Sequence, residues 1–189
     1  IVINELDALV NIDFETRTIN KTKKKLNLIR LGTSGALQKN IAIDTFIASS
    51  YGLGFDGLAH FYQNKELLEQ KMGNAYTIHA NWPVNLATPY FIKASECLLA
   101  KFPELAHGIT ATAPGFYGPQ GRALRLTPTI GDLHEKMETF RYKENKICNF
   151  EMETSALYYL GQTLGHNTLT ICAVIGNRLT KEYSKDYKK

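Results

Sequence analysis

The feature that most constrains the fold is an alternation between short apolar runs and segments with helical spacing. Runs such as residues 107–113 and 169–175 are rich in β-branched side chains, which is typical of buried strands. Segments between such runs, such as residues 153–164, space their apolar residues as an amphipathic helix does. Strands that alternate with helices predict an α/β layered fold with a parallel or mixed sheet.

These patterns predict the individual elements. The expected strands cover residues 26–31, 41–48, 58–62, 76–80, 107–113, 147–150 and 169–175. The expected helices cover residues 65–72, 88–102, 132–140 and 153–164, with a further helix at the start of the chain and a short one from Thr180. Residues 114–128 are rich in Gly and Pro and predict a long loop. The first helix has no capping residue before it, and we expect the natural protein to extend beyond both ends of this sequence.

Length and composition favour a single globular domain over residues 1–189. With 44% hydrophobic and 21% charged residues the chain is not disordered, and no apolar run reaches the roughly 20 residues of a membrane-spanning helix. The net charge of +4 is concentrated in two lysine clusters, which argues against a nucleic-acid-binding face. The clusters are Lys21, Lys23, Lys24 and Lys25, and Lys181, Lys185, Lys188 and Lys189.

The cysteines and histidines indicate neither a disulfide framework nor a metal site. Cys97, Cys148 and Cys172 are odd in number and form no CxxC pair, which points to a reducing, cytoplasmic setting. No metal-ligand spacing is present among His79, His107, His134 and His166, and we expect no metal and no cofactor.

Four predicted strand ends carry polar and aromatic residues. Because ligands bind beyond the carboxyl ends of strands in open α/β sheets, we expect these segments to meet in one site. The segments are Arg30–Gly35, Phe116–Arg122, Glu151–Glu153 and Asn177–Arg178.

The first and third segments suit a phosphate and a sugar. In residues 30–35 the glycines would let backbone N–H groups form an anion-binding nest, and the hydroxyls and the arginine would add donors. A plain turn with a surface arginine is the alternative. Glu153 could accept hydrogen bonds from vicinal sugar hydroxyls and Met152 could pack on the sugar, whereas a structural role at the helix N-terminus is favoured for Glu151.

The second segment suits a pyrimidine base. Phe116 can stack on a flat ring, the Gln120 amide can pair with an edge that carries a donor and an acceptor, and Arg122 can bind a carbonyl oxygen. The alternative is an ordered loop that packs Phe116 into the core.

Taken in order, these segments resemble the nucleoside phosphorylase family, most closely its uridine-cleaving members. The residues that carry the resemblance are Ile29–Gly35, Phe116–Arg122, Asn149–Glu153 and Ile175–Arg178, with a further stretch at Asp56–Phe61. The resemblance implies a three-layer α/β/α sandwich with a mixed central sheet. It also implies phosphorolysis of uridine to uracil and ribose 1-phosphate, with inorganic phosphate as co-substrate, no cofactor, and a homo-oligomer.

The resemblance also implies roles for individual residues. Phosphate would be bound by Arg30, Thr33 and Ser34, and ribose by Thr33, Met152 and Glu153. The base would be bound by Phe116, Gln120, Arg122, Ile175 and Arg178. Catalysis would depend on Arg30, Arg122 and Glu153.

Two departures from the family pattern leave alternatives open. Nothing before Arg30 matches the Gly-rich stretch that supplies a second phosphate arginine in the family, so a non-catalytic nucleoside-binding relative is one alternative. Gly176 is smaller than the apolar residue expected there. A nucleosidase or a purine-specific relative is a second alternative. The absence of an acid at residues 176–178 argues against both, since purine-cleaving relatives place one there.

Overall fold

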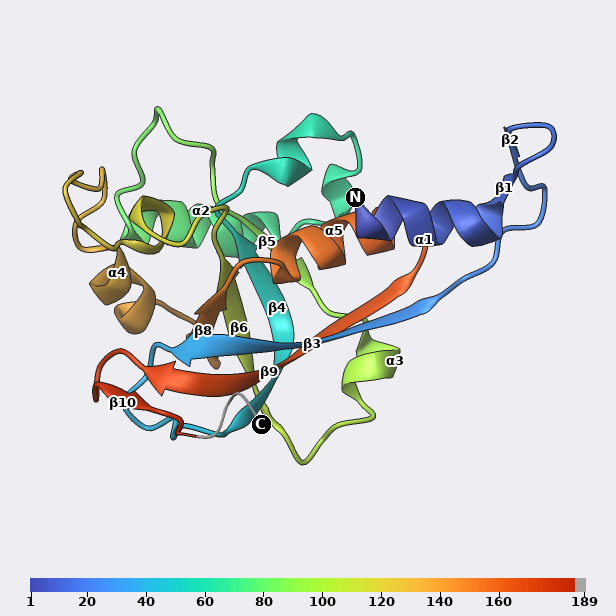
Figure 1. Ribbon diagram of the computed structural model, residues 1–189. Helices are drawn as coiled ribbons and strands as arrows, with labels where there is room; N and C mark the ends of the chain where they lie inside the picture. The colour runs from blue at the N-terminus through green and yellow to red at the C-terminus, as the bar shows by residue number, and fades with distance from the viewer. Residues whose placement is uncertain (186–189) are drawn as a thin grey trace.

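A computed structural model describes residues 1–185, which fold around an eight-stranded mixed sheet (Figure 1). The strands of this sheet are β3 (Asn27–Ala36), β4 (Phe46–Gly54), β5 (Tyr90–Lys93), β6 (Ala106–Thr112), β7 (Arg141–Tyr142), β8 (Asn145–Glu151), β9 (Asn167–Asn177) and β10 (Glu182–Tyr183). A separate two-stranded sheet contains β1 (Ile12–Asp13) and β2 (Thr18–Ile19). Lys188 and Lys189 of the second lysine cluster lie outside the described residues.

The helices include three short 3-10 turns. The α-helices are α1 (Val2–Asn11), α2 (Gln70–His79), α3 (Glu96–Leu99), α4 (Leu133–Thr139) and α5 (Thr154–Thr163). The 3-10 helices are η1 (Leu58–Phe61), η2 (Lys65–Leu67) and η3 (Gly118–Gln120).

The sheet mixes parallel and antiparallel pairs and closes on itself. Its order is β10-β9-β3-β8-β6-β4-β5, with β7 paired to β8. β9 runs parallel to β3 and also pairs with β4 in antiparallel register, at Phe46 opposite Ala173. This pairing joins β9, near one end of the strand order, to β4, near the other end. β4 and β8 both run parallel to β6, whereas the pairs β3–β8 and β4–β5 are antiparallel. The predicted mixed sheet is confirmed.

Helices cover both faces of the sheet, as the three-layer prediction requires. On β5, Phe91 packs into a core cluster that contains residues of α2 and α4. Its neighbours Tyr90 and Ile92 pack into a second cluster, with residues of α3 and α5. Because successive side chains of a strand point to opposite faces, the two clusters lie on opposite sides of the sheet.

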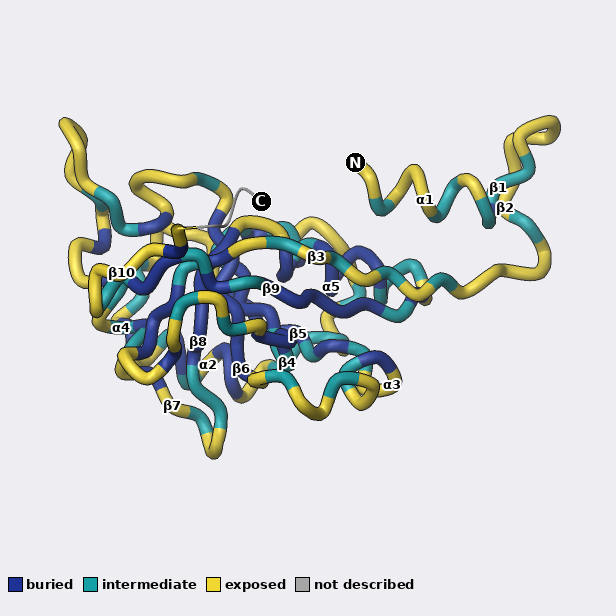
Figure 2. Tube along the Cα trace, turned by 60° about the horizontal axis from the view of Figure 1, so that its bottom comes forward, coloured by how far each residue is buried: buried dark blue, intermediate teal, exposed yellow. Residues whose placement is uncertain are grey.

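The N-terminal helix and the β1–β2 hairpin stand off from the rest of the chain and are largely exposed (Figure 2). The predicted helix at the start of the chain is confirmed as α1. It meets the body of the molecule where Ile3 packs against the second core cluster and Asp7 lies 3.1 Å from His166 Nε2. Within residues 1–185, no helix is long and apolar enough to cross a membrane.

The predictions for residues 107–113, 147–150 and 169–175 as strands are confirmed by β6, β8 and β9. Those for residues 132–140 and 153–164 as helices are confirmed by α4 and α5. Three others are inexact. The strand predicted over residues 41–48 begins only at Phe46, the extended segment 58–62 is the 3-10 helix η1, and the helix over residues 65–72 begins as η2 and continues into α2.

Three predictions are wrong because tertiary packing overrides local preference. Residues 76–79 belong to α2 and Ala80 follows its end, so this segment is not a strand. Tyr76 is fully buried against the core beneath that helix. Residues 88–102 are not one helix: Tyr90–Lys93 pair with β4 as β5, and only Glu96–Leu99 are helical. The helix expected from Thr180 is instead β10, which pairs with the end of β9.

Candidate active site

Arg30 to Gly35 lie inside β3 and not beyond its end. The strand continues to Ala36, with each residue paired to β9, so the predicted glycine nest is wrong. Burial alternates along this strand, which places Arg30, Gly32 and Ser34 on its more buried side and Thr33 on the exposed side.

The Arg30 guanidinium is held by two carboxylates and a thiol. Nη1 lies 3.0 Å from Glu151 Oε2 and donates to Cys172 Sγ at 3.4 Å, and Nη2 forms an ion pair with Glu153. Burial alone lowers the pKa of Arg30, but the neighbouring carboxylates outweigh it and the pKa is raised. Burial also raises the pKa of Cys172 to about 11, which keeps this thiol protonated at neutral pH.

The arginine reaches this position because residue 32 is a glycine. A Cβ at Gly32 would lie 2.6–2.7 Å from three atoms of the Arg30 guanidinium. The side chain of Arg30 therefore folds across the strand through space that any other residue at position 32 would fill.

Glu151 has the structural role that the sequence favoured. Its carboxylate is buried and accepts hydrogen bonds from Thr112 Oγ1 at 2.7 Å and from the backbone N–H groups of Glu153 and Thr154 at 3.0 Å. It thereby anchors the first turn of α5 and fixes the backbone of Glu153, whose side chain is 55% exposed. Met152, between the two carboxylates, is also exposed.

Ser34 and Thr33 differ in how they are placed. Ser34 is buried, and its hydroxyl accepts a hydrogen bond of 2.8 Å from Asn149 Nδ2. Asn149 in turn accepts from Thr110 Oγ1, so Ser34 belongs to an internal polar network. Thr33 is exposed on the other side of β3.

The second half of the site is built around the side-chain oxygen of Gln120. This oxygen accepts hydrogen bonds from Arg122 Nη1 at 2.6 Å and from Arg178 Nη2 at 2.7 Å, and Gln120 is buried. The Arg122 guanidinium also lies 3.7 Å from the centre of the Phe116 ring. Phe116 is 53% exposed, so the alternative in which it packs into the core is wrong.

Arg178 lies among groups from three parts of the chain. Its Nη1 is 2.6 Å from His134 Nε2 and 3.3 Å from the Gln120 backbone oxygen, and its guanidinium lies over the Phe150 ring. Burial, together with the charge of Arg122, lowers the pKa of Arg178 to about 10. Burial likewise lowers the pKa of Arg122. Two partly desolvated cations therefore converge on one amide oxygen.

Neighbouring strands join the two groups of residues. Arg178 packs over Phe150, the residue that precedes the carboxylate bound to Arg30. It also lies against Gly35, where a Cβ would be 3.5 Å from Arg178 Nε. The ends of β8 and β9 and the loop after β6 therefore meet β3, as the strand-end argument predicted.

The structure adds residues that the sequence analysis did not assign to the site. His134 comes from α4 and Tyr183 from β10, and neither shows any pattern in the sequence that links it to the strand ends. A Cβ at Gly176 would lie 3.0 Å from the Tyr183 ring, so the aromatic ring fills the space of the larger residue expected at position 176. Ile175 beside it is half-buried and binds Ser184 N through its backbone oxygen.

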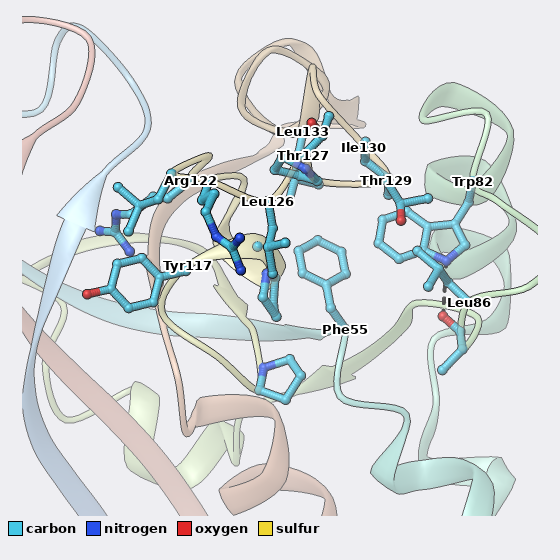
Figure 3. A pocket seen from close by; sticks show the side chains of 17 residues that line it. Phe55, Trp82, Leu86, Tyr117, Arg122, Leu126, Thr127, Thr129, Ile130 and Leu133 are labelled. Atoms are coloured by element: carbon cyan, nitrogen blue, oxygen red, sulfur yellow. Dashed lines mark hydrogen bonds between the residues drawn. The ribbon is translucent and has the colours of Figure 1, made fainter.

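A cavity of about 770 Å³ adjoins the Arg122 side of the site (Figure 3). Arg122 and Tyr117 lie on one wall and Trp82 on the opposite wall, with Phe55 between them. Trp82 is fixed by a hydrogen bond of 3.0 Å from its Nε1 to the Ala87 backbone oxygen. Arg30 and Glu153 do not line this cavity.

Comparison with known proteins identifies the family of the chain. Residues 10–188 match the sequence profile of the phosphorylase superfamily. The chain is 31% identical over 162 residues to a uridine phosphorylase of Thermococcus kodakarensis, covering 85% of this chain and 52% of that protein. It is 25% identical over 154 residues to a uridine phosphorylase of Haemophilus influenzae, covering 82% of this chain and 55% of that protein. The chain thus spans about half the length of these curated relatives.

Solved structures show the same fold. A crystal structure of a Trypanosoma brucei nucleoside phosphorylase, described as showing uridine phosphorylase activity, superposes with a TM-score of 0.84 at 22% identity, over 100% of this chain and 70% of that one. A uridine phosphorylase from Phytophthora capsici gives a TM-score of 0.53 at 22% identity, over 91% of this chain and 62% of that one. The predicted nucleoside phosphorylase fold is confirmed, and the chain belongs to the phosphorylase superfamily.

Proposed function

We propose that this protein cleaves uridine by phosphorolysis, with inorganic phosphate as co-substrate and uracil and ribose 1-phosphate as products. The observation that carries the proposal is the convergence of Arg122 and Arg178 on the Gln120 side-chain oxygen. The uridine phosphorylases to which the chain is similar support the same substrate.

The base would lie over Phe116 and against the Gln120 amide. Because both guanidinium groups are bound to the amide oxygen, the amide presents its Nε2 donor to a ligand. The Gln120 Nε2 donor, whose amide oxygen is bound to two guanidinium groups, suits a carbonyl oxygen of the base that gains negative charge during the reaction. Ile175, at the end of β9, would close the pocket.

Phosphate and ribose would lie at the other half of the site. Arg30 would bind phosphate, Glu153 would accept hydrogen bonds from the ribose hydroxyls, and Met152 would pack on the sugar. The side chain of Thr33 lies on the opposite side of β3 and is not brought next to Arg30. The ion pair between Arg30 and Glu153 supports this proposal, because it holds a phosphate donor and a hydroxyl acceptor side by side. Ser34 would add its hydroxyl hydrogen as a donor, since this hydroxyl only accepts in its bond with Asn149.

The reaction needs no proton transfer to the leaving group. A phosphate oxygen forms the bond to C1′ of ribose while the bond from C1′ to N1 of uracil breaks, and the electron pair of that bond goes to the base. The charge spreads onto the carbonyl oxygens of uracil, where the Gln120 amide and Arg122 would stabilise it. Donors of this kind act most strongly when they are fixed before the reaction begins, and the hydrogen bonds between these residues fix them.

The protein would act in the cytoplasm as a homo-oligomer. Its three cysteines are free, which supports a reducing compartment. Leu31 and Phe46 are 76% and 56% exposed on β3 and β4, and side chains of this kind are typical of surfaces that a second copy covers. Sedimentation velocity measures the assembly directly.

The assay that tests the proposed function follows uracil release from uridine with and without phosphate, and repeats it with inosine. We expect release from uridine that requires phosphate and no release of hypoxanthine from inosine. Release without phosphate would identify a nucleosidase, and cleavage of inosine would identify a purine-specific relative. Nucleoside binding without any cleavage would identify a non-catalytic relative.

A further inference from the structure

We propose that Thr112 is a positioning residue for the phosphate and ribose half of the site. Its hydroxyl connects the Glu151 carboxylate to the first turn of α5, and this connection keeps Arg30 and Glu153 in place without acting on the base half. The inference rests on the proposed function, because it assumes that Arg30 binds phosphate and that Glu153 binds ribose.

The Thr112 hydroxyl is used both as a donor and as an acceptor. It donates to Glu151 Oε1 at 2.7 Å and accepts from the Ser155 backbone N–H at 3.0 Å. Because a carboxylate paired with a guanidinium accepts and a backbone N–H can only donate, both directions are fixed. Thr112 is the last residue of β6 and is 1% exposed, so bulk water cannot replace either bond.

These bonds supply partners for the N–H groups at the start of α5. The first N–H groups of a helix have no acceptor within the helix itself. Glu151 accepts from the N–H groups of Glu153 and Thr154. Thr112 accepts from the next one, that of Ser155. The turn that bears Glu153 is therefore attached to the sheet by two side chains that also bind each other.

Two further contacts hold Ser155 from the side of β4. Its hydroxyl donates to Asp56 Oδ2 at 2.6 Å, and Asp56 Oδ1 accepts from the Tyr90 hydroxyl at 2.9 Å. A Cβ at Gly52 would lie 3.1 Å from Ser155 Cα, so β4 approaches the turn about as closely as a glycine allows. Asp56 begins the stretch Asp56–Phe61 of the family resemblance, and this contact connects that stretch to the turn. Ser155 is thus held between β4 and β6.

The connection reaches both ligand-binding side chains through Glu151. Glu151 Oε2 lies 3.0 Å from Arg30 Nη1 and accepts from the Glu153 N–H at 3.0 Å. Without the Thr112 hydroxyl, the carboxylate loses the donor that fixes its other oxygen and can turn away from Arg30. The Ser155 N–H loses its acceptor at the same time, so the turn that carries Glu153 is held less firmly.

The base half is not tied to this connection. Its three polar residues, Gln120, Arg122 and Arg178, bind one another. No hydrogen bond or ion pair within residues 1–185 connects them to Thr112 or Ser155. Uracil therefore probes the base half, whereas ribose 1-phosphate, which has no base, probes the other half.

The test measures the affinities for ribose 1-phosphate and for uracil by calorimetry in Thr112→Val and Thr112→Ser. Valine has nearly the shape of threonine but can neither donate nor accept, whereas serine keeps the hydroxyl. We expect Thr112→Val to weaken the binding of ribose 1-phosphate by about fivefold or more, the usual order of energetic coupling between sites. The binding of uracil should not change. Thr112→Ser should bind both ligands as tightly as the unaltered protein.

The matched control is Thr168→Val. Thr168 is buried, and its hydroxyl accepts from Gln162 Nε2 at 3.1 Å near the other end of α5. This variant loses a buried hydrogen bond to the same helix, so its thermal stability should fall while its affinity for ribose 1-phosphate does not change.

The outcomes separate this inference from the proposed function. If Thr112→Val and Thr168→Val have equal affinities for ribose 1-phosphate, the role of Thr112 is refuted and the proposed function stands. An equal loss of uracil binding and ribose 1-phosphate binding in Thr112→Val refutes it as well. If the unaltered protein binds neither ligand, the proposed function and this inference both fail.

A measurement on the unaltered protein covers the case in which Thr112→Val does not fold. The Ser155 amide hydrogen exchanges with solvent only when its bond to Thr112 opens. A ligand that needs the closed turn lowers the open population, so ribose 1-phosphate at about ten times its Kd should slow this exchange roughly tenfold, as followed by NMR. Uracil at the same multiple of its Kd should not slow it. Equal slowing by the two ligands, or no slowing by ribose 1-phosphate, would overturn the inference.

Discussion

Replacement of Gly32 by alanine tests whether the position of Arg30 matters for phosphate. A Cβ at residue 32 would lie 2.6 Å from the nearest guanidinium atom, whereas ordinary van der Waals contact begins at 3.4 Å. The guanidinium must therefore move by at least about 0.8 Å, and a misplacement of about 1 Å can cost on the order of 10²-fold in rate. We expect Gly32→Ala to lower kcat/KM for phosphate by roughly tenfold to a hundredfold.

The same change should cost little stability. The clash involves the end of a flexible side chain, and alanine restricts the unfolded chain more than glycine does. The thermal midpoint of Gly32→Ala should stay near that of the unaltered protein, while steady-state kinetics show the loss at limiting phosphate. Gly131→Ala is the control, because a Cβ at Gly131 would meet no atom within 4 Å. Unchanged phosphate kinetics in Gly32→Ala, or a loss that only follows unfolding, would refute the assignment of Arg30.

Three further substitutions test the rest of the site. Arg122→Ala should lower kcat/KM for uridine by roughly tenfold or more in steady-state assays. The control is Arg125→Ala, because Arg125 is exposed. An unchanged kcat/KM in Arg122→Ala would contradict the base-site assignment. Glu151→Gln should lower the free energy of unfolding in urea by about 1–3 kcal/mol. The amide has one acceptor fewer for the backbone N–H groups of Glu153 and Thr154, while Arg30 keeps its ion pair with Glu153. The control is Glu96→Gln, which removes an exposed ion pair with Lys93 and should leave the urea midpoint unchanged. Equal losses of stability in the two variants would show that Glu151 does not anchor α5. Gly121→Ala should cost about 1–2 kcal/mol, because Gly121 has a φ of 69°. A melting temperature no lower than that of Gly131→Ala would show that this turn adapts without strain.

The sequence predicted the long alternating part of the fold better than its local details. β6, β8 and β9 are buried along most of their length, as expected for strands covered on both faces of a sheet. Tyr90–Lys93 was misread as helix, since Thr88 and Pro89 resemble a helix start and pairing with β4 cannot be read locally.

The candidate site was predicted as a set of segments but not as a set of contacts. The residues at the strand ends do meet, as the ion pair between Arg30 and Glu151 and the bonds between Gln120 and Arg178 demonstrate. The glycine nest was wrong because Gly32 serves the Arg30 side chain and not a backbone turn. His134 could not be found from the sequence, since it reaches Arg178 through the folded position of α4 across 44 residues of chain.

The central claim is that phosphate, and not water, receives the ribosyl group from uridine. The most direct measurement incubates the protein with uridine and phosphate in ¹⁸O-labelled water and follows the products by ³¹P NMR and mass spectrometry. We predict a ribose 1-phosphate resonance that grows in step with uracil, with no solvent oxygen in the sugar. Free ribose that carries the solvent label, with an unchanged phosphate resonance, would contradict the account.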